Sequence, residues 1–304
     1  MSRKTSANLL MTAGSVIWGA AFVVQSIGSR YLGPFAFGAI RFFIGALVLL
    51  PVIKIMNNKD GAAPKADASF GEYLKGGLVC GTALFAAAAL QQQGIAMSGA
   101  SSAGFVTSLY VVLVPVFGFL FLKKKLTANT VLAVAIATVG VYLLCVTSSL
   151  TISKGDLFTM FGAVVWAVQI LLLESCSQRL DGLKFAFFEF MACAALGFIA
   201  TAVFERPPLE NIAAVVWPLL YCGVLSVGVG FTAQIICIKY TDPVVASLIM
   251  STEAVFAALM GWLILKESMS ARQLLGGALV FSGVILAQLP LKSKNGETAE
   301  AETG

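Results

Sequence analysis

FLFLKKKLTANTVLAVAIATVGVYLL, at residues 119–144, returns with changes as WLILKESMSARQLLGGALVFSGVILA at residues 262–287. A shift of 143 residues aligns the two stretches without a gap, and nine of the 26 positions are identical. In the first copy these are Leu120, Leu122, Lys123, Ala128, Leu132, Ala135, Gly140, Val141 and Leu143. Repetition at a fixed shift is typical of a duplicated unit, so the sequence predicts two copies of one fold.

The same duplication is visible at the front of each half. A shift of 148 residues places Gly14 on Gly162, Trp18 on Trp166 and Arg41 on Glu189. Between these points each half has room for five apolar helices. Because five is odd, the two copies must cross a membrane in opposite senses, which is the plan of many secondary transporters.

The composition indicates a membrane protein. Of 304 residues, 59% are apolar and 12% charged, about half the charge of a soluble domain, and the mean hydropathy is +0.91. A bilayer core needs about 20 apolar residues per helix. Ten stretches meet this need, at 8–27, 34–55, 74–96, 101–122, 128–147, 155–174, 184–204, 212–238, 243–265 and 271–290. We therefore expect an all-α polytopic membrane protein of ten transmembrane helices, arranged as two inverted five-helix repeats.

The expected units are a first repeat at 1–150, a second at 151–291 and a disordered cytoplasmic tail at 292–304. Placing the N-terminus inside puts fourteen basic residues on the cytoplasmic side and five on the other, with Arg41 inside the membrane. Short cytoplasmic loops carry the excess of Lys and Arg. The sequence thus predicts a multi-pass protein of the cytoplasmic membrane with both termini in the cytoplasm.

Several kinds of chemistry find no support. The chain has no histidine, which excludes Ser-His-Asp and Cys-His catalysis and the commonest zinc sites. Its six cysteines lie inside apolar runs without a CxxC spacing, so we interpret them as buried small apolar residues. The net charge of +5 comes from loop residues and indicates no nucleic-acid partner. No P-loop motif is present, and we expect no cofactor, no metal and no catalytic residue.

The ninth helix and its exit, DPVVASLIMSTEAVFAALMGWLILKE at 242–267, precede QLLGGALVFSG at 273–283. The first half carries WGAAF at 18–22, RFFIGAL at 41–47 and PVFGFLFL at 115–122. These motifs resemble the EamA-like permeases of the drug/metabolite transporter superfamily, over nearly the whole chain. One departure is the Lys run at 123–125, where many members carry a Glu. The resemblance implies export or uptake of amino acids, other metabolites or drugs.

Glu253 is the first candidate for the transport site. It lies about ten residues into the ninth predicted helix, where a charge costs about 2.5 to 3.5 kcal/mol on insertion scales. Ala246, Met250 and Ala257 share its stripe and leave room beside the carboxylate. We favour a substrate contact or a protonatable coupling group. The alternative is a packing carboxylate that is hydrogen-bonded to a neighbouring helix.

Two helices carry matched stripes of small, aromatic and polar residues. Trp18 and Gln25 lie on one face of the first helix, and Trp166 and Gln169 lie on one face of the sixth. Equivalent faces of inverted copies meet near the pseudo-twofold axis, so these residues are predicted to line a central pocket. Interhelical packing of the tryptophans explains the pattern equally well.

Three further polar residues are candidates for the same pocket. Gln91 in the third helix aligns with Gln234 in the eighth, and Tyr110 in the fourth aligns with Glu253. Consecutive helical residues point about 100° apart, so Gln91, Gln92 and Gln93 cannot all face one cavity and at least one is structural. An interhelical hydrogen bond is the equal alternative for Tyr110.

Arg41 and Glu189 lie about one and a half to two turns from opposite membrane faces. Long side chains can extend to the nearer interface from that depth, so topology or gating salt bridges are the alternative. We favour a packing role for both, and their opposite ends argue against a direct pair. Neither belongs to the predicted site.

The function predicted from these features is secondary transport by alternating access, in which a small metabolite such as an amino acid is exported. The partners are the solute and the lipid bilayer, with proton coupling through Glu253 as a hypothesis and no prediction for the oligomeric state. A multidrug efflux carrier is the alternative. A channel would need rings of like polar groups along one path, and an intramembrane enzyme would need a catalytic pair that the sequence does not show.

Overall fold

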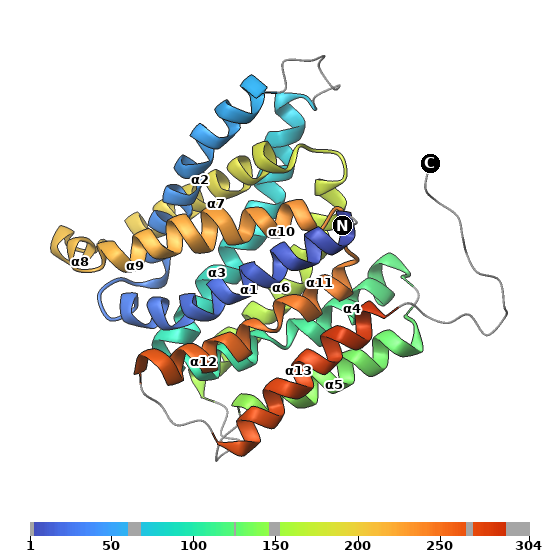
Figure 1. The fold of residues 1–304 in the computed structure, drawn as a ribbon. Coiled ribbons are helices and arrows are strands. Elements are labelled where there is room, and N and C mark those ends of the chain that lie inside the picture. Colours follow the sequence, from blue (N-terminus) through green and yellow to red (C-terminus); the bar gives the residue numbers. More distant parts are fainter. Residues whose placement is uncertain (1–2, 60–67, 125, 146–152, 266–269, 290–304) are drawn as a thin grey trace.

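The computed structural model describes all residues except 1–2, 60–67, 125, 146–152, 266–269 and 290–304. Every regular element in the described part is helical (Figure 1). The elements are α1 (Arg3–Gly28), α2 (Pro34–Lys59), α3 (Phe70–Thr107), α4 (Tyr110–Leu122), α5 (Ala128–Cys145), α6 (Lys154–Ser177), α7 (Gly182–Phe204), α8 (Leu209–Ala214), α9 (Val216–Leu220), the π-helix η1 (Tyr221–Phe231), α10 (Thr232–Cys237), α11 (Pro243–Met250), α12 (Glu253–Leu265) and α13 (Ala271–Gln288). The predicted tail at 292–304 and the loop at 266–268 lie outside the described residues.

Nine apolar helices of the described residues are long enough to cross a membrane, and Ala128–Leu143 is a shorter tenth. Large apolar side chains such as Phe121, Phe204 and Trp217 are 73 to 80% exposed on the outside of the bundle. Exposed apolar surface on that scale is compatible with lipid and not with water. The predicted all-α membrane fold is confirmed.

Hydrogen bonds between helix ends show which ends lie at the same face of the bundle. The Asn8 amide donates to Gln288 Oε1 at 2.9 Å and Thr241 donates to Asn8 at 2.8 Å, so α1 begins where α13 ends. We call this the terminal face. At the other face, Ser102 donates to Asp156 at 2.6 Å and the Asn211 amide donates to the carbonyl of Tyr31 at 2.9 Å.

The two halves run in opposite senses. Helix α1 begins at the terminal face, whereas its counterpart α6 begins at the opposite face with Asp156 and returns to the terminal face, where Glu174 binds Lys124. The packing repeats under the same exchange: α3 packs on α6 as η1 and α10 pack on α1, while α2 lies on α7 and α5 on α13. Figure 1 shows α5 and α13 side by side at the edge of the bundle.

Two of the predicted transmembrane helices are broken, at equivalent positions. The predicted helix 101–122 is divided between the end of α3 and α4, with Ser108 and Leu109 between them. The predicted helix 243–265 is divided between α11 and α12 by Ser251 and Thr252. A shift of 143 residues carries the first break onto the second, so the discontinuity belongs to the repeated unit.

Helix α3 also bends sharply at Gly99, where φ is +83°. An L side chain seldom adopts that conformation, whereas glycine does so freely. The bend falls between the predicted third and fourth helices, so a positive-φ glycine joins two membrane crossings without a long loop.

The predicted helix 212–238 consists of four segments, α8, α9, η1 and α10. Its central eleven residues form a π-helix, whose wider turn is rare and often marks a functional site. Glycines let neighbouring helices approach this segment closely. A Cβ on Gly45 would lie 2.3 Å from Val227, and one on Gly223 would lie 2.6 Å from Ile44.

Candidate functional site

The break in the second half places Glu253 at the first position of α12. The Ser251 hydroxyl donates to the carbonyl of Leu248 and the Thr252 hydroxyl donates to the carbonyl of Ile249, both at 2.7 Å. These bonds satisfy carbonyls at the end of α11 inside the membrane, where water is absent. The positive end of the α12 dipole then meets the Glu253 carboxylate, which favours a negative charge at this point.

Tyr110 occupies the corresponding place in the first half, as the first residue of α4. Its hydroxyl donates to Glu253 Oε1 at 3.1 Å, and both side chains are buried. The two residues are 143 positions apart, which is the repeat shift. Equivalent helix starts therefore meet at the seam between the halves.

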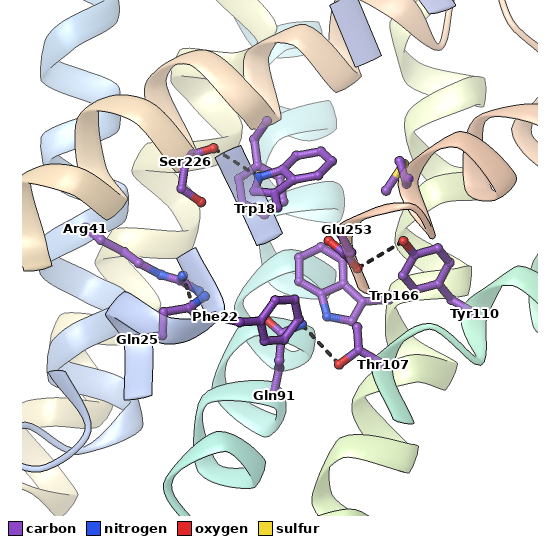
Figure 2. Close-up of a pocket in the computed structure, with 12 residues that line it drawn as sticks. Trp18, Phe22, Gln25, Arg41, Gln91, Thr107, Tyr110, Trp166, Ser226 and Glu253 are labelled. Atoms are coloured by element: carbon purple, nitrogen blue, oxygen red, sulfur yellow. Dashed lines mark hydrogen bonds between the residues drawn. The ribbon is translucent and has the colours of Figure 1, made fainter. Parts of the chain in front are cut away.

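A small buried cavity surrounds this contact, with a volume of about 30 Å³ (Figure 2). None of the lining residues is more than 7% exposed, so the walls are shielded from solvent. Such a volume has room for roughly one or two water molecules, whereas small-molecule sites hold about 300 to 1,000 Å³, so a solute would enter only if the walls moved apart. The lining residues are Trp18, Phe22, Gln25, Arg41, Gln91, Thr107, Tyr110, Trp166, Ser226, Phe231, Met250 and Glu253.

Aromatic rings form much of the wall. Trp166 stacks on Phe231 with 5.6 Å between ring centroids and 10° between planes, and Trp18 lies 5.1 Å from the same ring. The Trp18 indole donates to the carbonyl of Ser226 at 3.2 Å. The buried Trp166 Nε1 has no hydrogen-bond partner within the described structure. Flat apolar surfaces with one unused donor suit a planar or partly apolar solute.

Six of the eight predicted site residues line this pocket, namely Trp18, Gln25, Gln91, Tyr110, Trp166 and Glu253. Gln169 and Gln234 are fully buried but lie outside the lining. The Gln169 amide donates to Glu189 Oε1 at 3.0 Å, and the Gln234 amide approaches the sulfur of Met250 at 3.7 Å.

Of the three consecutive amides in α3, Gln91 reaches the pocket and donates to Thr107 at 3.2 Å. Gln92 instead donates to the backbone carbonyl of Gln25 at 3.1 Å, which holds α3 against α1. Adjacent side chains on this helix therefore serve different purposes, as their angular spacing requires.

Arg41 is not among the predicted site residues, but its side chain lines the pocket. Its side chain is 2% exposed, Nη1 donates to Gln25 Oε1 at 2.7 Å, and the guanidinium lies 5.0 Å from the centroid of Phe42. Depth alone suggested that Arg41 could extend to the interface, whereas its direction depends on how α2 packs. Glu189, its counterpart, is fully buried beside Gln169, and no described ion pair joins it to Arg41.

The described residues contain no candidate metal centre. No group of three or more His, Cys, Asp or Glu side chains there could hold a metal ion. The five described cysteines are free, and four of them are buried. Cys145 lies where side chains are not described.

The fold and the pocket define a class: a multi-pass membrane protein of two inverted helical repeats around a buried cavity with aromatic and polar walls. The EamA-like transporter family model matches this chain twice, over residues 5–146 and 153–289. The chain belongs to the EamA-like transporter family.

Similar proteins agree with this assignment. The chain is 30% identical to an uncharacterized transporter of Archaeoglobus fulgidus, over 94% of this chain and 87% of that protein. It is 24% identical to the uncharacterized transporter YoaV of Bacillus subtilis, over 90% and 93% of the two chains. A crystal structure of a protein that is 19% identical in sequence superposes on this one with a TM-score of 0.75, over 93% of this chain and 96% of that one. At that level of identity the likeness shows a shared fold and nothing further.

Proposed function

We propose that this transporter is a secondary carrier that binds a small solute in the pocket between its halves and releases it by alternating access. One observation carries the proposal. Equivalent breaks in the two repeats meet at Tyr110 and Glu253, inside a pocket whose walls are shielded from solvent. Broken helices near the middle of inverted repeats commonly form the sites of secondary transporters.

Both faces carry contacts that opening would have to break. At the terminal face, Lys124 Nζ lies 2.5 Å from Glu174 and 3.8 Å from Asp242, so it joins the ends of α4, α6 and α11. At the opposite face, Ser102 donates to Asp156, and the hydroxyls of Ser98 and Ser153 lie 2.7 Å apart. Alternating access would open one set while the other stays closed, which fits the closed pocket as an occluded state.

Glu253 is the proposed coupling group. Among the pocket-lining residues it is the one carboxylate, and the chain has no histidine. A proton taken up at Glu253 would remove a negative charge from the pocket, and its release would restore that charge. Solute binding and proton binding would then be linked through one side chain.

Orientation and direction are part of the proposal. The sequence puts the excess of Lys and Arg on the side of the N-terminus, and we assign the terminal face to the cytoplasm on that basis. Both termini would then be cytoplasmic in a cytoplasmic membrane. We propose export, with amino acids or similar metabolites as the first solutes to test.

Transport by purified protein in proteoliposomes tests this function. A thermal-shift screen of amino acids, nucleosides, vitamins and cationic drugs first identifies a ligand, because only a ligand that prefers the folded state raises the melting temperature. Counterflow of that ligand is then measured with and without a pH gradient in wild type, Glu253→Gln and, as a control outside the pocket, Glu210→Gln. We expect saturable counterflow in all three and loss of the gradient's effect in Glu253→Gln alone. An unchanged response in that variant removes Glu253 from coupling, and transport that does not saturate contradicts a carrier.

A further inference from the structure

Arg41 is a buried cation without a counter-ion. None of its nitrogens lies within 4.0 Å of a carboxylate in the described part of the chain. Its neighbours are neutral: the Gln25 amide, the rings of Phe37 and Phe42, and the thiols of Cys193 and Cys222. Arginine stays protonated in proteins, so the charge cannot be removed by loss of a proton.

The hydrogen bonds of Arg41 are also incomplete. A guanidinium has five N–H donors, and the buried Nε of Arg41 has no partner. A buried charge without a partner is strongly destabilising. An apolar side chain would fill the same space without that free-energy cost, so packing alone does not explain an arginine here. A charged residue inside a membrane protein normally faces a partner or a functional cavity. Arg41 faces the pocket.

We propose that Arg41 binds an anionic group of the solute, and that the solute is a carboxylate attached to a flat apolar body. This inference rests on the proposed function, because it places the solute in the same pocket. The planar guanidinium can donate two parallel hydrogen bonds to a carboxylate, an interaction that also supplies the missing counter-charge. A phosphate or sulfonate is also anionic, but each is larger than a carboxylate, so we assign the site to a carboxylate.

The rest of the pocket sets the shape of such a solute. Figure 2 shows Arg41 and Gln25 at one end and Glu253 with Tyr110 at the other, with the side chains of Trp18, Phe22 and Trp166 between them. Aromatic faces between two polar ends match the chemistry of a ring system that carries the carboxylate on one side, and the cavity of about 30 Å³ would have to widen to admit it. A hydrogen-bond donor on its far side, such as an amine or a hydroxyl, would meet the Glu253 carboxylate.

Pairs of ligands that differ only in charge test the inference without changing the protein. Phenylacetate, indole-3-propionate and tryptophan are compared with their primary amides, by thermal shift and by titration against purified wild type in detergent. Each pair has nearly the same shape, but the amide carries no negative charge. We expect at least one acid to bind about 10 to 100 times more tightly than its amide, as for a charged hydrogen bond.

Variants then assign the difference to Arg41. Arg41→Gln should bind acid and amide equally, whereas Arg41→Lys should keep part of the preference, because it keeps the charge without the fork geometry. Arg272→Gln is the matched control, since Arg272 is exposed and stacks on Tyr142 outside the pocket. Size-exclusion profiles establish that each variant is folded before it is titrated.

The outcomes separate the two proposals. Equal binding of acids and amides by wild type, failure of every acid to bind, or an acid preference that survives in Arg41→Gln would overturn the anion site. If a neutral or cationic solute still shows saturable counterflow, the carrier function stands and only the inference about Arg41 fails. If no solute of any charge shows counterflow, the carrier function itself fails.

Discussion

Replacing Gly19 by alanine tests the close contact that holds the Glu253 half-helix against α1. A Cβ built on Gly19 would lie 2.5 Å from Cβ of Phe256 and 2.7 Å from the backbone nitrogen of Ala257. Contacts that short do not occur in real structures, and the obstacle includes backbone of α12, which cannot rotate away. The helices would have to separate where Trp18 and Glu253 face the same pocket.

Gly38→Ala supplies the matched control. Gly38 is also helical, but a Cβ there meets no atom within 4 Å. Both changes gain roughly 0.5 to 1 kcal/mol from the higher helix propensity of alanine. Only Gly19→Ala adds the cost of overpacking, about 1 to 3 kcal/mol. We expect that difference in stability between the two variants.

The assay is the fraction of monodisperse protein that remains after heating in detergent, measured by size-exclusion chromatography. The melting temperature of Gly19→Ala should fall below that of Gly38→Ala by a few degrees, and its ligand binding should weaken. Equal melting temperatures with unchanged binding would refute the proposed close approach of α1 and α12.

Other predictions concern the pocket and its closure. Tyr110→Phe removes a hydrogen bond to a buried carboxylate, which is worth about 1.5 to 3 kcal/mol, so transport should fall by about tenfold or more. Tyr221→Phe removes a hydroxyl bonded to the carbonyl of Ile17 outside the pocket and should leave transport near wild type. Lys124→Met breaks an ion pair whose side chains are each 25% exposed, so stability should change by less than about 1 kcal/mol. The same variant should nevertheless increase the rate at which a thiol reagent on the terminal face labels a cysteine placed at Thr107, which lines the pocket. An unchanged labelling rate would show that Lys124 does not hold the pocket closed.

The helices and their duplication were predictable from the sequence because lipid imposes a simple rule on length and polarity. The repeat shift aligned Tyr110 with Glu253 as equivalent positions, and the structure brings the two side chains within hydrogen-bond distance, which the alignment did not predict. Tertiary contacts were not needed to predict the helices or their duplication.

Breaks inside the helices were not predictable in the same way. The break in the second half is formed by Ser251 and Thr252. Serine and threonine are common in membrane helices, and their hydroxyls can bond to carbonyls of an intact helix as well as to those at a break. The π-helix at 221–231 packs against α1 and α2, and a single sequence does not display such contacts between helices. The sequence indicated how deep Arg41 lies in the membrane but not the side toward which its side chain points, because that depends on the rotation of α2 within the bundle.

Accessibility of one pocket residue from the two sides of the membrane tests alternating access most directly. Thr107 lines the pocket and is 2% exposed. Thr107→Cys, in a chain whose native cysteines are replaced by alanine, is treated in vesicles with a membrane-impermeant thiol reagent on one side or the other. Arg206→Cys, exposed at the opposite face, reports whether the reagent stays on its side. The account predicts labelling of Thr107→Cys from both sides, slowed by bound solute. Labelling from one side only under all conditions, or from neither, would contradict a carrier that exposes this pocket to each side in turn.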